Sequence, residues 1–161
     1  MIRPFRRADL EAIRHLTVVC FEGVSIDRNM EERLGVIGDR DWRWRKARAV
    51  EEDAADAPGR HVFVAEVEGQ VAGYISLRLD HETRIGWIPN LAVAPARQGR
   101  GLGRRLIRHA LEFMTRQGMA GARIETLEQN PVGSHLYPDA GFVEVARQIH
   151  YAMRLPPEPE G

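Results

Sequence analysis

The sequence contains one cysteine, Cys20, and therefore cannot form a disulfide within the chain. It has no run of about 18 apolar residues, the length that a membrane-spanning helix needs. Residues 1–10 carry charges and no apolar run, which predicts no signal peptide. With 23 basic and 23 acidic residues, no excess of charge favours nucleic acid or an anionic membrane. We therefore expect a cytoplasmic protein that partners with neither.

Residues of the types that can bind metals are scattered along the chain. Histidine and cysteine do not cluster at the spacing of a zinc site, so no metal is expected. Cys20 ends an apolar pattern of helical spacing, which favours a buried structural thiol over a nucleophile. The length of 161 residues predicts a single domain over residues 1–155. Residues 156–161 include three prolines and no core-forming side chain, which predicts a disordered tail.

The spacing of apolar residues predicts an α/β (α+β) fold with a mixed sheet. Hairpins beside one helical crossover favour a mixed sheet over a parallel one. Asp9 is expected to cap the first helix, Pro89 to interrupt a strand and Gly118 to end a helix. The expected strands are 2–5, 61–67, 71–79, 83–93, 122–127 and the extended segment 142–155, and the expected helices are 10–20, 30–37, 42–55, 102–117 and 132–137.

The most informative stretch is 91–104, where a strand ends, three alternating glycines follow and an amphipathic helix begins. N–H groups at a helix start have no partner within the helix, and the helix dipole places partial positive charge there. Glycines let an anion approach these N–H groups closely. A P-loop is excluded because no Lys-Ser or Lys-Thr pair follows, and a dinucleotide fingerprint is excluded because Arg104 occupies its last glycine position. The turn therefore predicts another phosphate ligand, with Arg97, Arg100, Arg104 and Arg105 adding positive charge; the simpler alternative is a strand-to-helix connector.

Two motifs resemble those of the GCN5-related N-acetyltransferase (GNAT) family. Residues 98–103, Gln-Gly-Arg-Gly-Leu-Gly, fit the family signature Gln/Arg-x-x-Gly-x-Gly/Ala. Asn130, then Leu136-Tyr137, then Gly141-Phe142 follow a second family pattern at the usual spacing. The resemblance extends from residue 2 to about residue 155. It implies a six- or seven-stranded mixed sheet with helices on both faces and two strands that splay apart at the cofactor site.

The resemblance also implies an activity, in which acetyl-CoA donates an acetyl group to a primary amine by direct attack in a ternary complex. The acceptor would be a small molecule or a protein amine, and relatives are often homodimers. Asn130 would hold the pantetheine arm, and Tyr137 would act as general acid near the CoA sulfur. The expected backbone contacts to the cofactor are those of Leu91 and Val93 for pantetheine and those of Gln98, Gly99, Arg100, Gly101, Leu102, Gly103 and Arg104 for the pyrophosphate.

Three departures from the family pattern stand out. Trp87 occupies the slot in which many relatives carry a glutamate that acts as base through water. Pro138 is expected to end or kink the short helix at Tyr137. The segment after Phe142 is short for a two-strand hairpin, which leaves a seventh strand open.

The general base and the acceptor are not fixed by the sequence. Asn90 lies beside the expected splay and can orient a water or the acceptor, whereas His81, Glu82 and His135 are more typical of surface residues than of a base. The expected acceptor region is 21–60, with acidic residues for a cationic amine and two indoles that serve as a pocket wall or as packing residues. These residues are Glu22, Asp27, Glu31, Glu32, Trp42 and Trp44.

Two other functions stay open, a CoA-binding regulatory module without catalysis and a structural protein.

Overall fold

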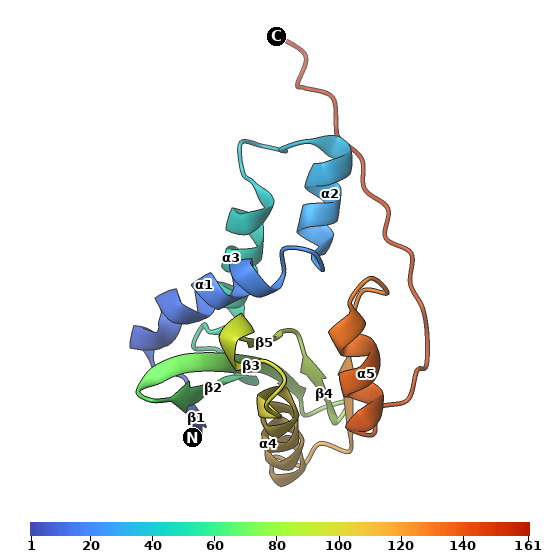
Figure 1. The fold of residues 1–161 in the computed structure, drawn as a ribbon. Helices are drawn as coiled ribbons and strands as arrows, with labels where there is room; N and C mark the ends of the chain where they lie inside the picture. The colour runs from blue at the N-terminus through green and yellow to red at the C-terminus, as the bar shows by residue number, and fades with distance from the viewer.

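A six-stranded mixed sheet forms the centre of the computed structural model, which describes residues 1–161 (Figure 1). The strands run in the order β1-β2-β3-β4-β6, and β5 pairs with β3 beside β4. Every pairing is antiparallel except that of β4 with β6, which is parallel, so the mixed sheet is confirmed. The strands are β1 (Ile2–Pro4), β2 (Arg60–Val67), β3 (Gln70–Asp80), β4 (Ile85–Ile88), β5 (Leu91–Val93) and β6 (Gly121–Ile124).

Helices cover both faces of the sheet, as Figure 1 shows. On one face, Leu106, Ile107 and Met114 of α4 pack on buried side chains of β2 and β3. On the other, α1 and α3 pack on alternate residues of the same strands, including Tyr74. None of these helices contains an apolar stretch of the length that a membrane span requires. The helices are α1 (Leu10–Cys20), α2 (Ile26–Leu34), α3 (Trp42–Asp53), α4 (Leu102–Arg116) and α5 (Pro131–Asp139), with 3-10 turns η1 (Arg7–Asp9) and η2 (Pro95–Arg97).

Two expected helix starts differ from the structure. Asp9 precedes α1 but does not cap it, because its carboxylate accepts hydrogen bonds from the Arg3 guanidinium and from Arg6 N instead. The helix expected at 30–37 begins at Ile26, where the Ser25 hydroxyl accepts a hydrogen bond from Arg28 N, and it ends before Gly35. At Asp9 a tertiary contact with Arg3 of β1 replaced the helix cap, whereas Ser25 caps α2 through a local hydrogen bond.

The end of the chain also differs from expectation. Helix α5 continues two residues beyond Tyr137, because Pro138 lies in its last turn, where a missing N–H removes only one helical bond. Residues 143–161 form neither helix nor strand, so the sheet has six strands and no seventh. The interruption expected at Pro89 is confirmed, since this residue separates β4 from β5.

Candidate functional site

The sheet opens beside β5. Strand β3 pairs with β4 through Arg78–Asp80 and with β5 through Gly73–Ile75. Strand β6 pairs with β4 alone, and its last partner is Ile88. Beyond Ile88, β5 therefore has a neighbour on one side only. This is the splay that the resemblance implied.

The free edge of β5 carries backbone groups of Leu91 and Val93. Asn90 O accepts a hydrogen bond from Ser76 N at 2.9 Å, and Ala94 N donates to Ala72 O at 2.8 Å. Because antiparallel strands alternate the direction of their backbone groups, those of Leu91 and Val93 point away from β3. The Val93 carbonyl already accepts from Gln98 Nε2 at 2.9 Å and from the Cys20 thiol at 3.2 Å. The Val93 N–H and the backbone groups of Leu91 remain for a ligand.

The glycine turn between η2 and α4 forms an open cradle of backbone donors. Gly99 and Gly101 have φ angles of 75° and 79°, and a Cβ atom added to either would meet no atom within 4 Å. No N–H group from Gly99 to Arg104 donates to another group of the protein. Gln98 N, by contrast, donates to Pro95 O at 3.4 Å. Six adjacent amides at a helix start fit a di-anionic phosphate group, whose approach a side chain at either glycine would block.

Two of the four arginines near this turn are held by carboxylates. Arg97 pairs with Glu68 at 2.6 Å, and Arg104 pairs with Asp139 of α5 at 2.7 Å. Arg100 and Arg105 form no ion pair. The free positive charge at the turn is therefore smaller than the sequence suggested, which leaves the open backbone amides as the main candidate for holding an anion.

Tyr137 lies on α5, which packs beside the start of α4. A Cβ atom at Gly103 would lie 3.4 Å from Leu136 of α5, so the two helices nearly touch there. The Tyr137 ring packs edge-on against Phe142, with 6.3 Å between ring centroids, and its hydroxyl makes no hydrogen bond within the chain. Burial raises the pKa of Tyr137 to about 12. The phenol is therefore protonated at neutral pH and has a free hydrogen to donate.

Asn130 caps α5, a role that the sequence analysis did not assign to it. Its Oδ1 accepts from Val132 N at 3.2 Å and from Gly133 N at 3.3 Å. Its Nδ2 donates to Thr126 Oγ1 at 3.0 Å. Asn followed by proline is a typical helix start, so the pair Asn130-Pro131 in the sequence already indicated that Asn130 caps a helix. The cap fixes the helix that carries Tyr137.

A buried polar network anchors Asn90, the residue before β5. Asp53, at the end of α3, is 3% exposed and accepts from Asn90 Nδ2 at 2.6 Å and from Ser76 Oγ at 3.2 Å. Its other oxygen accepts from Arg78 at 2.7 Å. Lys46 Nζ donates to Asn90 Oδ1 at 2.8 Å, and burial lowers the pKa of this lysine. Sequence reasoning noticed only Asn90, since the other members are far apart in the chain.

We expect Asp53→Ala to lower the free energy of unfolding by about 3 kcal/mol, because the substitution removes a buried carboxylate and leaves its buried hydrogen-bond partners unpaired. Urea denaturation measures this change. Glu32→Ala is the control, because Glu32 makes an exposed pair with Arg28 on α2 and should cost less than about 1 kcal/mol. Equal losses in the two variants would contradict the anchoring role of Asp53.

Trp87 faces a carboxylate from the neighbouring strand. Its indole Nε1 donates to the carboxylate of Glu125, which follows β6 directly. Since Ile124 pairs with Ile88, Glu125 is level with Pro89, where β5 leaves β6. The slot that lacks the expected glutamate thus has a carboxylate beside it, one that sequence reasoning missed because it required the strand pairing.

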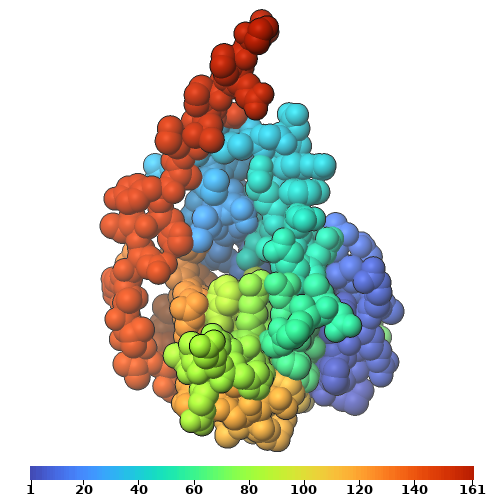
Figure 2. Space-filling model, turned by 180° about the vertical axis from the view of Figure 1, so that it is seen from behind, coloured from blue at the N-terminus to red at the C-terminus, as the bar shows by residue number.

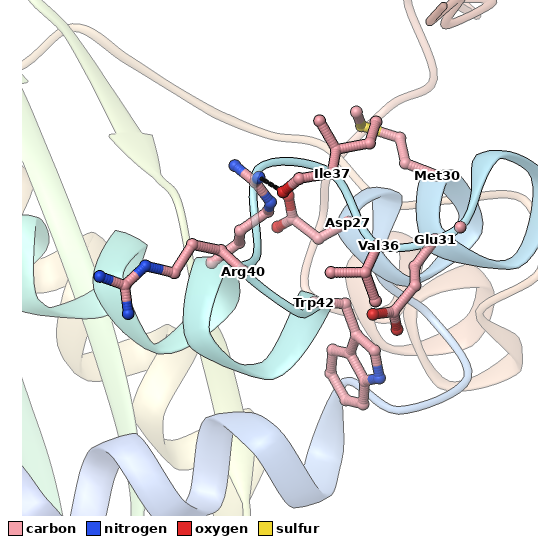
Figure 3. Close-up of a pocket in the computed structure, with 9 residues that line it drawn as sticks. Asp27, Met30, Glu31, Val36, Ile37, Arg40 and Trp42 are labelled. Carbon is pink, nitrogen blue, oxygen red and sulfur yellow. Dashed lines mark hydrogen bonds between the residues drawn. The ribbon is translucent and has the colours of Figure 1, made fainter. Parts of the chain in front are cut away.

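The expected acceptor region forms a shallow pocket between α2 and the start of α3 (Figure 3). Trp42 is buried and lines this pocket, whereas Trp44 is exposed beside Arg40. Acidic Asp27 and Glu31 share the pocket lining with Arg40 and Arg45.

The remaining acidic and histidine candidates lie outside this pocket. Glu22 and Glu32 each pair with Arg28, whereas Asp27 and Glu31 form no ion pair. His81, Glu82 and His135 are exposed, and their side chains hydrogen-bond to none of the site residues.

The splayed sheet, the open amide cradle and the adjacent tyrosine define a mixed α/β fold with unpartnered backbone donors at a strand edge. The sequence model of the acetyltransferase (GNAT) family matches residues 10–142. The chain belongs to this family.

Named relatives include acetyltransferases of different substrates. The chain is 31% identical over 90 residues to streptothricin acetyltransferase of Streptomyces lavendulae, covering 56% of this chain and 48% of the relative. It is 32% identical over 102 residues to N-alpha-acetyltransferase RimI of Mycobacterium tuberculosis, covering 59% and 60%. The matches thus span less than two thirds of these relatives.

Solved structures share the fold over nearly the whole chain. An aminoglycoside N-acetyltransferase in complex with CoA superposes with a TM-score of 0.68 at 20% identity, covering 96% of this chain and 100% of that one. The ribosomal-protein-S18-alanine N-acetyltransferase from Escherichia coli gives 0.67 at 20% identity, covering 91% and 79%. At such identities the likeness shows the fold alone.

Proposed function

We propose that this chain is an acetyl-CoA-dependent N-acetyltransferase that acts on a primary amine. The observation that carries the proposal is the set of unpartnered amides from Gly99 to Arg104 beside the free edge of β5. In this proposal the amides hold the pyrophosphate, and Leu91 and the Val93 N–H hold the pantetheine arm. Asn130 contacts that arm from the start of α5, where its side chain also caps the helix.

Tyr137 supplies the proton that the leaving group needs. The amine nitrogen bonds to the acetyl carbon, the carbon–sulfur bond breaks, and the Tyr137 hydroxyl protonates the departing thiolate. The nitrogen then releases its second proton to solvent, and the Tyr137 phenolate regains a proton from solvent. A lysine-like amine is neutral in only about one molecule in a few thousand at pH 7, so its proton must also be removed. Acetyl transfer therefore needs a second group, a base, on the acceptor side of the sheet.

We propose Glu125 as this base, acting through one water. Its carboxylate is level with the point where β5 departs from β6, and the Trp87 indole fixes one of its oxygens. The carboxylate is exposed, and its other oxygen lies 3.8 Å from Arg123 Nη1, so the water of this proposal would bind beside that guanidinium. The proton of the amine passes through the water to Glu125 and then to solvent.

Glu125→Gln is expected to lower kcat about a hundredfold, because the amide keeps the contact to Trp87 but cannot accept the proton. Steady-state kinetics at saturating acetyl-CoA measures the effect, and the KM for acetyl-CoA should not change. Glu128→Gln serves as control, because Glu128 is an exposed carboxylate only three residues further along the chain. An unchanged kcat in Glu125→Gln would remove Glu125 from the mechanism.

The activity itself is tested by CoA release from acetyl-CoA with a panel of primary amines, from aminoglycosides to peptide N-termini. Release that depends on an amine is the expected result. Thermal unfolding with and without CoA is the companion measurement, since ligand at about 100 times Kd stabilises a fold by roughly 2.7 kcal/mol. A thermal shift without release for any amine would favour a CoA-binding module, and no shift would overturn the cofactor site.

A further inference from the structure

Three arginines and one tryptophan form a row across four strands of the sheet. Arg60 of β2 is opposite Arg78 of β3. Arg78 is in turn opposite Trp87 of β4, and Trp87 is opposite Arg123 of β6. Because opposite residues on neighbouring strands point to the same face of a sheet, the four side chains share one face, and we call them the arginine row. Arg78 Nη2 donates to Asp53 Oδ1 at 2.7 Å, so this is the face on which α3 packs, beside the last residue of that helix.

Two guanidinium groups of the arginine row lie against the Trp87 ring. The Cζ atom of Arg78 is 5.2 Å from the ring centroid, and that of Arg123 is 5.4 Å from it. Both distances are in the range of a cation–π contact. The ring itself is oriented by the hydrogen bond from its Nε1 to Glu125. Two positive groups are thereby held near one oriented side chain.

Carboxylates neutralise the arginine row only in part. Asp53 accepts from Arg78 Nε at 3.2 Å and from Nη2 at 2.7 Å, which leaves Nη1 without a partner. Arg60 donates to a backbone carbonyl of α3 and forms no ion pair. The Arg123 side chain is 62% exposed and donates no hydrogen bond within the chain, and its nearest carboxylate, that of Glu125, is 3.8 Å away. Since like charges on neighbouring strands lower stability, the row favours a bound anion.

The arginine row lies close to the opening of the sheet. Trp87 is two residues before Pro89, which is level with Glu125 and marks the point where β5 leaves β6. At a rise of about 3.3 Å per residue, the row is about 7 Å from this level. Seen from behind, the green segment that includes β4 is open to the viewer between α3 and the end of the chain (Figure 2). One ligand can therefore reach both the row and the opening of the sheet.

We propose that the amine acceptor carries an anionic group, a carboxylate or a phosphate, and that the guanidinium groups of Arg123 and Arg78 bind it. This inference rests on the proposed function, because it concerns the acceptor of the same reaction. An arginine side chain can donate two parallel hydrogen bonds to either kind of anion, which then supplies the counter-charge that the row lacks. The amine of the same molecule lies near Glu125, about 7 Å or more from its anionic group.

Four amines with the same six-carbon chain test this charge preference, and they differ at the end remote from the amine. They are ε-aminocaproate, ω-aminohexyl phosphate, hexylamine and hexamethylenediamine. We expect kcat/KM for at least one of the two anionic amines to be at least about tenfold higher than that for hexylamine. The carboxylate and the phosphate show which anion the row prefers. A higher kcat/KM for hexylamine or for the diamine than for both anionic amines would overturn the inference.

Arg123→Gln is the second test, because it removes the exposed guanidinium and leaves the contacts of Asp53 in place. The ratio of kcat/KM for the preferred anionic amine to that for hexylamine should fall to about one. A change in the chemical step affects both amines and cancels in this ratio. Arg116→Gln is the control, because it removes an exposed arginine of α4, on the opposite face, and should leave the ratio unchanged.

The outcomes separate this inference from the function on which it rests. CoA release with none of the amines would overturn the proposed function and the inference together. Release with a ratio near one in the unmodified chain would overturn the inference alone. A ratio that Arg123→Gln does not lower, or that Arg116→Gln lowers equally, would do the same.

Discussion

Valine in place of Gly101 is expected to weaken acetyl-CoA binding about a hundredfold. The side chain would fill the open space in front of the amides from Gly99 to Arg104. Loss of two hydrogen bonds to a charged phosphate costs about 3 kcal/mol or more, and each 1.4 kcal/mol is a factor of ten. Isothermal titration with acetyl-CoA measures the change.

Gly118→Val is the matched control for backbone strain. Gly118 ends α4, has a φ angle of 85°, and also has no atom within 4 Å of an added Cβ. Valine is strained by about 1–2 kcal/mol at either end of the helix, so both variants should lose similar stability. Only Gly101→Val should lose affinity. Equal affinity in the two variants would show that the turn is merely a connector.

Tyr137→Phe is expected to lower kcat about a thousandfold with little change in the affinity for acetyl-CoA, because the ring packing against Phe142 is kept and only the proton donor is lost. Single-turnover kinetics with saturating amine measures the step. Tyr74→Phe is the control: it removes a buried hydroxyl that bonds Thr17 at 2.6 Å, so stability should fall while kcat stays. An unchanged kcat in Tyr137→Phe would contradict the acid role.

The pH dependence of the loss of kcat in Tyr137→Phe follows from the pKa of about 12 for Tyr137. Because the phenol stays protonated, the ratio of wild-type to variant kcat should be constant between about pH 7 and pH 10. Burial of the neutral phenol stabilises the fold fully below the unfolded pKa near 10, and this contribution is lost as the pH rises toward 12. If the ratio of wild-type to variant kcat already decreased at pH values below about 9, a different group would be the proton donor.

Local patterns predicted the elements that form the proposed cofactor side of the site. The alternating glycines, the helix from Leu102 and the break at Pro89 all depend on residues close in sequence, and the structure has each of them. The splay followed from the family resemblance and is present beside β5. Which residues touch the cofactor is still a prediction.

The proposed acceptor side was not predictable in the same way, because its contacts join distant segments. Asp53 meets Asn90 only when α3 packs on β3, and Glu125 meets Trp87 only when a helical crossover brings β6 beside β4. Asp9 shows the same limitation within a short stretch, since its choice of Arg3 over α1 depends on where β1 lies. Patterns in sequence do not encode such competition between partners.

The reactivity of the single thiol of the chain, Cys20, can show whether a ligand occupies the free edge of β5. Cys20 donates to the Val93 carbonyl, and burial raises the pKa of this thiol, so disulfide reagents should label it slowly. A colorimetric assay of released CoA then carries a background of no more than one equivalent per chain. A ligand seated along that edge would shield Cys20, so the labelling rate itself would measure occupancy of the site without any turnover.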